Sequence, residues 1–229
     1  MAMAMKRIIC VRHSITECNE ALARTPWGTP GFADPGLYDT VLSERGLSLA
    51  KEVRHKLETK QIPVEFEGVQ LVVSSPLTRA LQTSEILFGS ESVIPKEARK
   101  VAQPLLRERC YLASDVGKPR SVLETSFPNW DFQSLPIDDS VWWYTTPREG
   151  SLSDEWRPTG RYLCPGEPKK VFNARISQLK SWIMSQQEDK IVIVAHWGLL
   201  RGLFGLDVSN CAIISKTSND FLDAPPEDC

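Results

Sequence analysis

Three short apolar runs alternate along the chain with longer segments in which apolar residues recur every three or four positions. The runs cover Arg7 to Val11, Val69 to Val73, and Lys190 to Ala195. Each is rich in β-branched residues and nearly continuous in hydrophobicity, which is typical of a parallel strand covered on both faces. They predict three buried strands.

The segments with helical spacing lie between these strands. Ser43 to Lys60 predicts a helix that begins at Ser43, and Ser75–Pro76 predicts a second, with Ser75 as N-cap, that ends near Gly89. Lys169 to Gln186 predicts a third helix. The apolar stripe expected on this third helix consists of Val171, Ala174, Leu179, Trp182 and Ile183. Alternating strands and helices predict an α/β fold around a mainly parallel sheet.

Three stretches interrupt this alternation. Pro26 to Thr40 is rich in proline and glycine and predicts a loop. Cys110 to Pro168 is long and rich in proline and tryptophan, so we expect a partly helical insertion or lid within a single domain spanning residues 1–229. The tail after about Ser215 is acidic and is expected to fray.

Composition narrows the class of partner. The 27 basic and 29 acidic residues give a net charge of −2, which argues against a nucleic-acid or membrane-surface partner. Apolar runs are all shorter than the roughly 18 residues that a membrane span needs. The six cysteines form no C-x-x-C pair and no cluster has metal-ligand spacing. These features predict a soluble, cytoplasmic protein with reduced thiols and no metal.

Two of the three histidines directly follow predicted strands. His13 comes after the first strand and His196 after the last, whereas His55 lies among charged residues in a predicted helix. Arg12 ends the first strand, and Arg79 lies in the first turns of the helix after the second strand. Because the carboxyl ends of parallel strands share one edge of a sheet, we expect these four residues to meet in one crevice. Two guanidinium groups beside a helix N-terminus would suit a phosphate dianion.

Four segments together resemble a known family. Arg12–Asn19 resembles the R-H-G-x-T-x-x-N signature of the histidine phosphatase, or phosphoglycerate mutase-like, superfamily. Leu42–Gly46 resembles its L-[ST]-x-x-G segment, Ser74–Thr83 its S-S-P-x-x-R-A-x-Q-T segment, and Ala195–Gly198 its closing histidine element. Ser14 departs from the pattern, because the family usually has glycine there, and we expect local adjustment rather than loss of activity.

The resemblance implies a three-layer α/β/α sandwich and a role for each matching residue. His13 would accept the phosphoryl group. The implied phosphate pocket consists of Arg12, Asn19, Arg79 and His196, with Asn19 as an auxiliary contact. Glu108 occupies the place of the family's proton donor. Its alternative is a surface carboxylate between Arg107 and Arg109.

The expected activity is hydrolysis of a small phosphomonoester through a phosphohistidine, without metal or cofactor. Arg12, Arg79 and a protonated His196 would keep His13 neutral and nucleophilic. Basic residues of the insertion could contact a second charged group of the substrate: Lys118, Arg120, Arg148, Arg157 and Arg161.

Three alternatives stay open at this point. The same core residues suit phosphoglycerate mutase-type transfer, and the fold could also carry a non-catalytic binding protein. A metal-dependent hydrolase would use His13, His196 and a cysteine such as Cys10. The sequence names neither the substrate nor the oligomeric state.

Overall fold

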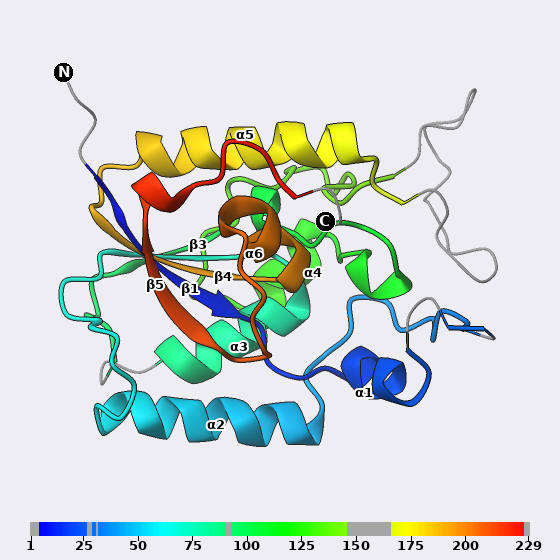
Figure 1. Ribbon diagram of the computed structural model, residues 1–229, viewed down its shortest axis with the longest axis horizontal. Coiled ribbons are helices and arrows are strands. Elements are labelled where there is room, and N and C mark those ends of the chain that lie inside the picture. The colour runs from blue at the N-terminus through cyan, green and yellow to red at the C-terminus, as the bar shows by residue number, and fades with distance from the viewer. Residues whose placement is uncertain (1–4, 27–28, 31, 90–92, 146–165, 227–229) are drawn as a thin grey trace.

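The protein is a three-layer α/β/α sandwich, as expected (Figure 1). The computed structural model describes residues 5–26, 29–30, 32–89, 93–145 and 166–226. Helices α2 (Glu44–Glu58) and α3 (Thr78–Phe88) cover one face of a central sheet. Helices α5 (Lys169–Ser185) and α6 (Trp197–Phe204) cover the other.

The sheet has five strands in the order β3-β2-β4-β1-β5. In chain order they are β1 (Arg7–Arg12), β2 (Leu71–Ser74), β3 (Arg99–Ala102), β4 (Lys190–Ala195) and β5 (Ile213–Thr217). All neighbours are parallel except β5, which runs antiparallel to β1. The three expected strands are confirmed, with small shifts at the ends of β1 and β2. The register aligns Arg12 with Ala195, so the carboxyl ends of β1 and β4 meet.

Shorter helical elements complete the described chain: α1 (Glu17–Arg24), α4 (Arg120–Ser126) and the 3-10 turns η1 (Pro104–Leu106), η2 (Ala113–Asp115) and η3 (Ser218–Asp220).

Alternation along each strand divides the core into two halves. Ile9 and Val11 pack with α2 and α3 in one buried cluster, whereas Ile8 and Cys10 pack with α5 and α6 in the other. Successive side chains of a strand point to opposite faces, so a strand between two helical layers must be apolar at every position. This explains why the strands read as continuous apolar runs.

The start of α3 differs from the prediction. The helix begins at Thr78 with Leu77 as its cap, not at Ser75–Pro76. The backbone N–H of Ser75 donates to Val194 O at 2.9 Å, which extends the pairing of β2 with β4 by one residue. Asp39 then caps the helix from the expected loop, because its Oδ1 accepts from the Thr78 N–H at 2.8 Å. In its described part that loop contains no helix or strand.

The buried face of α5 was predicted only in part, because Leu179 and Ile183 are buried as expected and Val171 and Ala174 are exposed. Val171 is 40% exposed, and the buried residues are Phe172, Arg175, Ile176, Leu179 and Ile183. An arginine is normally excluded from an apolar stripe, but Arg175 is buried by an ion pair with Glu167, in which Nη2 and Oε2 lie 2.6 Å apart. The buried face of α5 therefore includes a charged residue, which a pattern of apolar residues does not reveal.

The expectation that the tail frays after about Ser215 is wrong for the described residues. Ser215 lies in β5 and pairs with Ile9 of β1. The N–H of Ser218 then donates to Lys6 O at 2.9 Å. Pairing with β1 satisfies backbone groups that a solvated tail would leave to water.

The insertion expected at Cys110–Pro168 is partly helical in its described part, which includes η2 and α4. Asp131 pairs with β3. Its N–H donates to Lys100 O, and its carbonyl oxygen accepts from the Ala102 N–H, both at 2.9 Å. Three of its tryptophans are buried in the core: Trp130, Trp142 and Trp143. Trp156 and three of the basic residues considered above, Arg148, Arg157 and Arg161, lie outside the described residues.

Candidate active site

The carboxyl ends of β1 and β4 place two histidines side by side. The His13 N–H donates to Ala195 O at 2.9 Å, which continues the parallel pairing past the end of β1. His196 is the N-cap of α6, and the centroids of the two imidazole rings lie 5.1 Å apart. Both histidines therefore meet at one sheet edge, as the sequence predicts.

His13 is held in one tautomer. It is buried, and its Nδ1 lies 2.7 Å from Ser14 O, so Nδ1 carries the hydrogen and Nε2 carries the lone pair. Burial, Arg79 and Arg12 lower the pKa of His13 well below its ordinary value. The imidazole is therefore neutral near pH 7, with its nucleophilic nitrogen unprotonated.

Ser14 adopts a backbone that does not require glycine. It does not lie in the left-handed region, and its N–H donates to Thr83 Oγ1 at 2.9 Å. Its hydroxyl donates to Gly46 O at 2.8 Å. The serine hydroxyl thus links the segment after β1 to the start of α2. Serine is accommodated here without the backbone freedom that the family's usual glycine would provide.

His196 is neutral, which corrects the expected protonated state. Arg79 Nε donates to its Nδ1 at 3.3 Å, and an imidazolium nitrogen could not accept this bond. Burial, Arg79 and His13 lower the pKa of His196 well below its ordinary value. Its remaining nitrogen, Nε2, is buried without a hydrogen-bond partner among the described residues.

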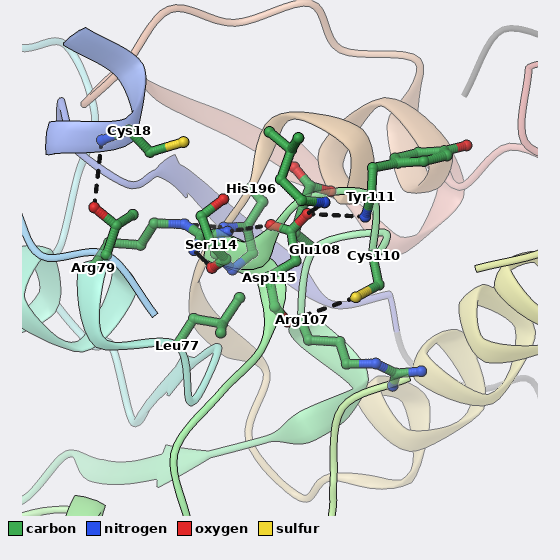
Figure 2. Close-up of polar contacts among 12 residues, drawn as sticks. Cys18, Leu77, Arg79, Arg107, Glu108, Cys110, Tyr111, Ser114, Asp115 and His196 are labelled. Carbon is green, nitrogen blue, oxygen red and sulfur yellow. Dashed lines mark hydrogen bonds and ion pairs between the residues drawn. The ribbon is translucent and has the colours of Figure 1, made fainter. Parts of the chain in front are cut away.

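Arg79 is anchored by a carboxylate that sequence reasoning missed. Its Nη2 lies 2.9 Å from Asp115 Oδ1, and its Nη1 donates to Ser114 O (Figure 2). Asp115 Oδ2 accepts from the N–H groups of Tyr111 and Leu112, each at 3.0 Å. Asp115 belongs to the insertion and to no motif, so only the tertiary structure brings it to Arg79.

Arg12 is partly committed to the backbone. Its Nη1 donates to Val208 O at 2.7 Å, while Nε is buried without a partner among the described residues. Arg12 Nε and His196 Nε2 are thus two buried donor nitrogens beside His13. Buried donors without partners are costly, so such a pair favours an acceptor-rich ligand such as a phosphoryl group.

Glu108 is not a surface carboxylate between arginines, as the alternative interpretation had it. Its Oε1 accepts from the Arg109 N–H at 2.8 Å and its Oε2 from the Gly198 N–H at 3.1 Å. Burial raises the pKa of Glu108, and the nearby carboxylate of Asp115 raises it further. A carboxyl group with a raised pKa at the first turn of α6 suits a general acid.

Glycine is needed where α6 faces this carboxyl group. A Cβ on Gly198 would lie 2.6 Å from Glu108 Oε1. The glycine of the closing motif therefore leaves room for the acid beside His196.

Asn19 is held mainly by its own helix. It forms a capping box with Thr16 at the start of α1, and its Oδ1 accepts from the Thr16 N–H at 3.1 Å. Asn210 Nδ2 donates to the same oxygen at 3.3 Å and to His13 O at 3.1 Å. Asn210 is a second residue that the motifs did not indicate, and it lies nearly 200 positions from the histidine that it supports.

One cavity of about 550 Å³ brings these side chains together. Five of the six residues proposed from the sequence line it: Arg12, His13, Asn19, Arg79 and Glu108. His196 lies behind them, in contact with the His13 ring and Arg79. The remaining lining residues are Thr16, Cys18, Leu22, Arg109, Tyr111, Leu112, Ser114, Asp115, Trp197 and Gly198.

Cys10 does not join this site. It is packed in the core with α5 and α6, and burial raises the pKa of its thiol. Within the part of the chain that the structure describes, no three histidine, cysteine or carboxylate side chains are grouped as a metal site would need. In the same part, no helix has both the length and the apolar character to cross a bilayer.

Comparison with other proteins assigns this arrangement to a family. The family model of the histidine phosphatase superfamily (branch 1) matches residues 8–209. A "Phosphoglycerate mutase-like protein" of Arabidopsis thaliana is 26% identical over 203 residues, which cover 77% of this chain and 67% of that protein. A "Probable phosphatase" of Schizosaccharomyces pombe is 30% identical over 101 residues, which cover 44% of each chain.

Solved structures share the fold at lower identity. The alpha-ribazole phosphatase from Shigella flexneri has a TM-score of 0.50 at 18% identity, covering 91% of this chain and 89% of that one. Phosphoglycerate mutase from Bacillus anthracis has a TM-score of 0.50 at 14% identity, covering 96% and 91%. The family model matches most of the chain, and the paired histidines lie at the sheet edge. This chain therefore belongs to the histidine phosphatase superfamily.

Proposed function

We propose that this protein is a phosphatase that hydrolyses phosphomonoesters through a phosphohistidine intermediate on His13. The observation that carries the proposal is the neutral His13, with its Nδ1 bound to Ser14 O and Nε2 left as the nucleophile. Donors from Arg12, Arg79 and His196 surround it, which is the environment that a phosphoryl group needs.

In the first step, His13 Nε2 forms a bond to phosphorus and the ester P–O bond breaks. Glu108 gives its proton to the leaving alkoxide. The raised pKa of Glu108 supports this role, since a carboxyl group with an ordinary pKa would be ionised at neutral pH.

In the second step, water attacks phosphorus and the P–N bond breaks. The Glu108 carboxylate takes a proton from this water, so that phosphate leaves and both His13 and Glu108 return to their starting states. Negative charge on the phosphoryl oxygens is balanced in both steps by Arg12 and Arg79. The mechanism uses no metal or cofactor, so it predicts that activity survives a chelator.

The test compares wild type with His13→Ala, and with His55→Ala as the matched control. His55 is an exposed histidine on α2, away from the cavity. We expect phosphate release from a panel of phosphomonoesters in the presence of a chelator, loss of release in His13→Ala, and unchanged release in His55→Ala. Acid-labile, base-stable phosphate trapped on wild type and absent from His13→Ala would identify the intermediate.

The alternative is phosphoryl transfer of the phosphoglycerate mutase type, which needs the same four core residues but retains the phosphoryl group. Conversion of 3-phosphoglycerate that depends on a bisphosphoglycerate primer, with no net phosphate release, would establish that alternative. Failure of both assays, with an intact fold, would leave a binding protein.

A further inference from the structure

The candidate cavity has an apolar wall in addition to its phosphate-binding end. Leu22 on α1, Leu112 in the segment before η2, and Trp197 at the start of α6 all line it, together with Tyr111. These residues come from three separate parts of the chain. The resemblance to the family did not assign any of them a role.

The wall is held in place by contacts with neighbouring residues. Trp197 Nε1 donates to Asp207 Oδ1 at 2.7 Å, and Arg201 lies 5.3 Å from the centroid of the Trp197 ring. Leu112 is buried at 7% exposure, and its N–H is bound to Asp115. An apolar surface that is already ordered loses little conformational freedom when a ligand covers it.

Cations also line the cavity. Among the described residues these are Arg12, Arg79 and Arg109. The first two belong to the phosphate-binding end, and Arg109 Nε donates to Glu167 O at 3.0 Å while its guanidinium covers the Tyr111 ring. Of the insertion's basic residues that the structure describes, Lys118 pairs with Asp39 and Arg120 with Glu124.

The cavity also contains carboxyl groups. Glu108 and Asp115 both line the cavity, and Figure 2 draws them between Arg79 and Tyr111. Asp115 is paired with Arg79, and Glu108 is the proposed acid, so both carboxyl groups belong to the phosphate-binding end.

We infer that the substrates are phosphomonoesters of apolar alcohols. This inference rests on the proposed phosphatase function, and it specifies the alcohol part of the substrate. The phosphoryl group lies at Arg12, His13 and Arg79, and the alcohol covers Leu22, Leu112 and Trp197. Selectivity arises because each methylene that leaves water against this wall favours binding.

A series of straight-chain alkyl phosphates tests the inference, because ethyl, butyl and hexyl phosphate release alkoxides of nearly equal basicity. Differences in kcat/KM then report contacts with the wall rather than leaving-group chemistry. We expect kcat/KM to rise about threefold per added methylene.

Two variants locate the effect on the wall. Leu22→Ala and Trp197→Ala should each flatten the dependence on chain length, while inhibition by inorganic phosphate stays within about twofold of wild type. Val122→Ala is the matched control, because Val122 is an exposed apolar residue on α4 that does not line the cavity. It should leave the chain-length dependence unchanged.

The outcomes separate the two proposals. No phosphate release from any ester would overturn the phosphatase function itself. Release that is equal along the alkyl series would overturn the apolar substrate class and leave the phosphatase in place. A steep series that persists in both wall variants would also overturn it, because the contacts would then lie elsewhere.

Discussion

Glu108 and His13 act as a pair of titratable groups whose surroundings move their pKa values in opposite directions. Burial and Asp115 raise the pKa of Glu108, whereas burial, Arg79 and Arg12 lower the pKa of His13. Each group is thereby kept neutral over a wider pH range than it would be in water. A neutral imidazole and a neutral carboxylic acid in one cavity are the combination that the first step of the proposed mechanism requires.

The residue-scale prediction concerns Glu108→Gln. With an alkyl phosphate, kcat should fall by about 10²–10⁴-fold, because the leaving alkoxide loses its proton donor. With 4-nitrophenyl phosphate the loss should be much smaller, because nitrophenolate leaves without protonation. Steady-state kinetics on both esters measures the difference, and an equal loss on both would argue against Glu108 as the acid.

The pH dependence of kcat follows from the same two groups. Activity should persist below the ordinary imidazole pKa of about 6.5, because protonation of His13 is shifted to lower pH. It should decline as the pH rises through the raised pKa of Glu108, because the acid is then ionised. Glu108→Gln should remove that decline at high pH, and a decline retained by the variant would assign it to another group.

At the scale of elements, the motif residues hold the segments around the site against each other. Gln82 on α3 accepts from the Leu42 N–H at 2.9 Å through its Oε1, and Thr83 accepts from Ser14. Gly46 lets the first turn of α2 approach the segment after β1, because a Cβ there would lie 1.8 Å from Ile15 O. These residues connect segments of the fold, although the motifs that contain them also contain or adjoin the candidate catalytic residues.

The element-scale prediction is that Gly46→Ala destabilises the fold. The added methyl group meets a backbone carbonyl that no side-chain rotation can move, so α2 must shift away. The free energy of unfolding should fall by at least about 1–3 kcal/mol, the usual cost of overpacking. Urea unfolding checks this, with Ser48→Ala on the exposed side of α2 expected to change it by less than about 0.5 kcal/mol. A loss no greater than that of Ser48→Ala would contradict the close approach.

At the scale of the whole molecule, Glu167 joins the end of the insertion to the segment that carries Glu108. It is fully buried, and its Oε1 lies 3.0 Å from Arg107 Nη2 while its Oε2 lies 2.6 Å from Arg175 Nη2. Arg175 also donates to Arg107 O at 2.7 Å and to Glu108 O at 3.3 Å. Burial acts to raise the pKa of Glu167, but Arg175 and Arg107 outweigh it and lower the pKa.

The whole-molecule prediction concerns Glu167→Gln, which leaves two buried guanidinium groups without their carboxylate. The free energy of unfolding near pH 7 should fall by about 3–5 kcal/mol. The carboxylate's contribution is present above the unfolded pKa of about 4.3 and is lost as the pH falls through the lowered folded value. The gap between wild type and variant should therefore narrow below about pH 4.

Urea unfolding at both pH values measures this gap. Glu124→Gln is the control, because its exposed pair with Arg120 should contribute less than about 1 kcal/mol. A Glu167→Gln loss as small as that of the control would show that the buried cluster is not what joins these segments.

The sequence by itself was sufficient for the features that depend on local spacing and on the order of elements. Continuous apolar runs predicted the strands, because a strand covered on both faces has no polar side. His13, Arg12 and His196 could be placed at one edge, because parallel strands end together. Arg79 lies within one of the family motifs, and Glu108 was implied by the place of the family's proton donor.

Only the tertiary structure shows which residues that are distant in the chain contact one another. Asp39 moves the start of α3, Arg175 completes the buried face of α5, and pairing with β1 orders the segment around Ser215. Asp115 forms an ion pair with Arg79. This ion pair restricts the side-chain conformations of an arginine that the family resemblance places in the phosphate pocket. Each of these contacts joins residues distant in the chain, and local periodicity carries no information about which distant polar group will satisfy a buried one.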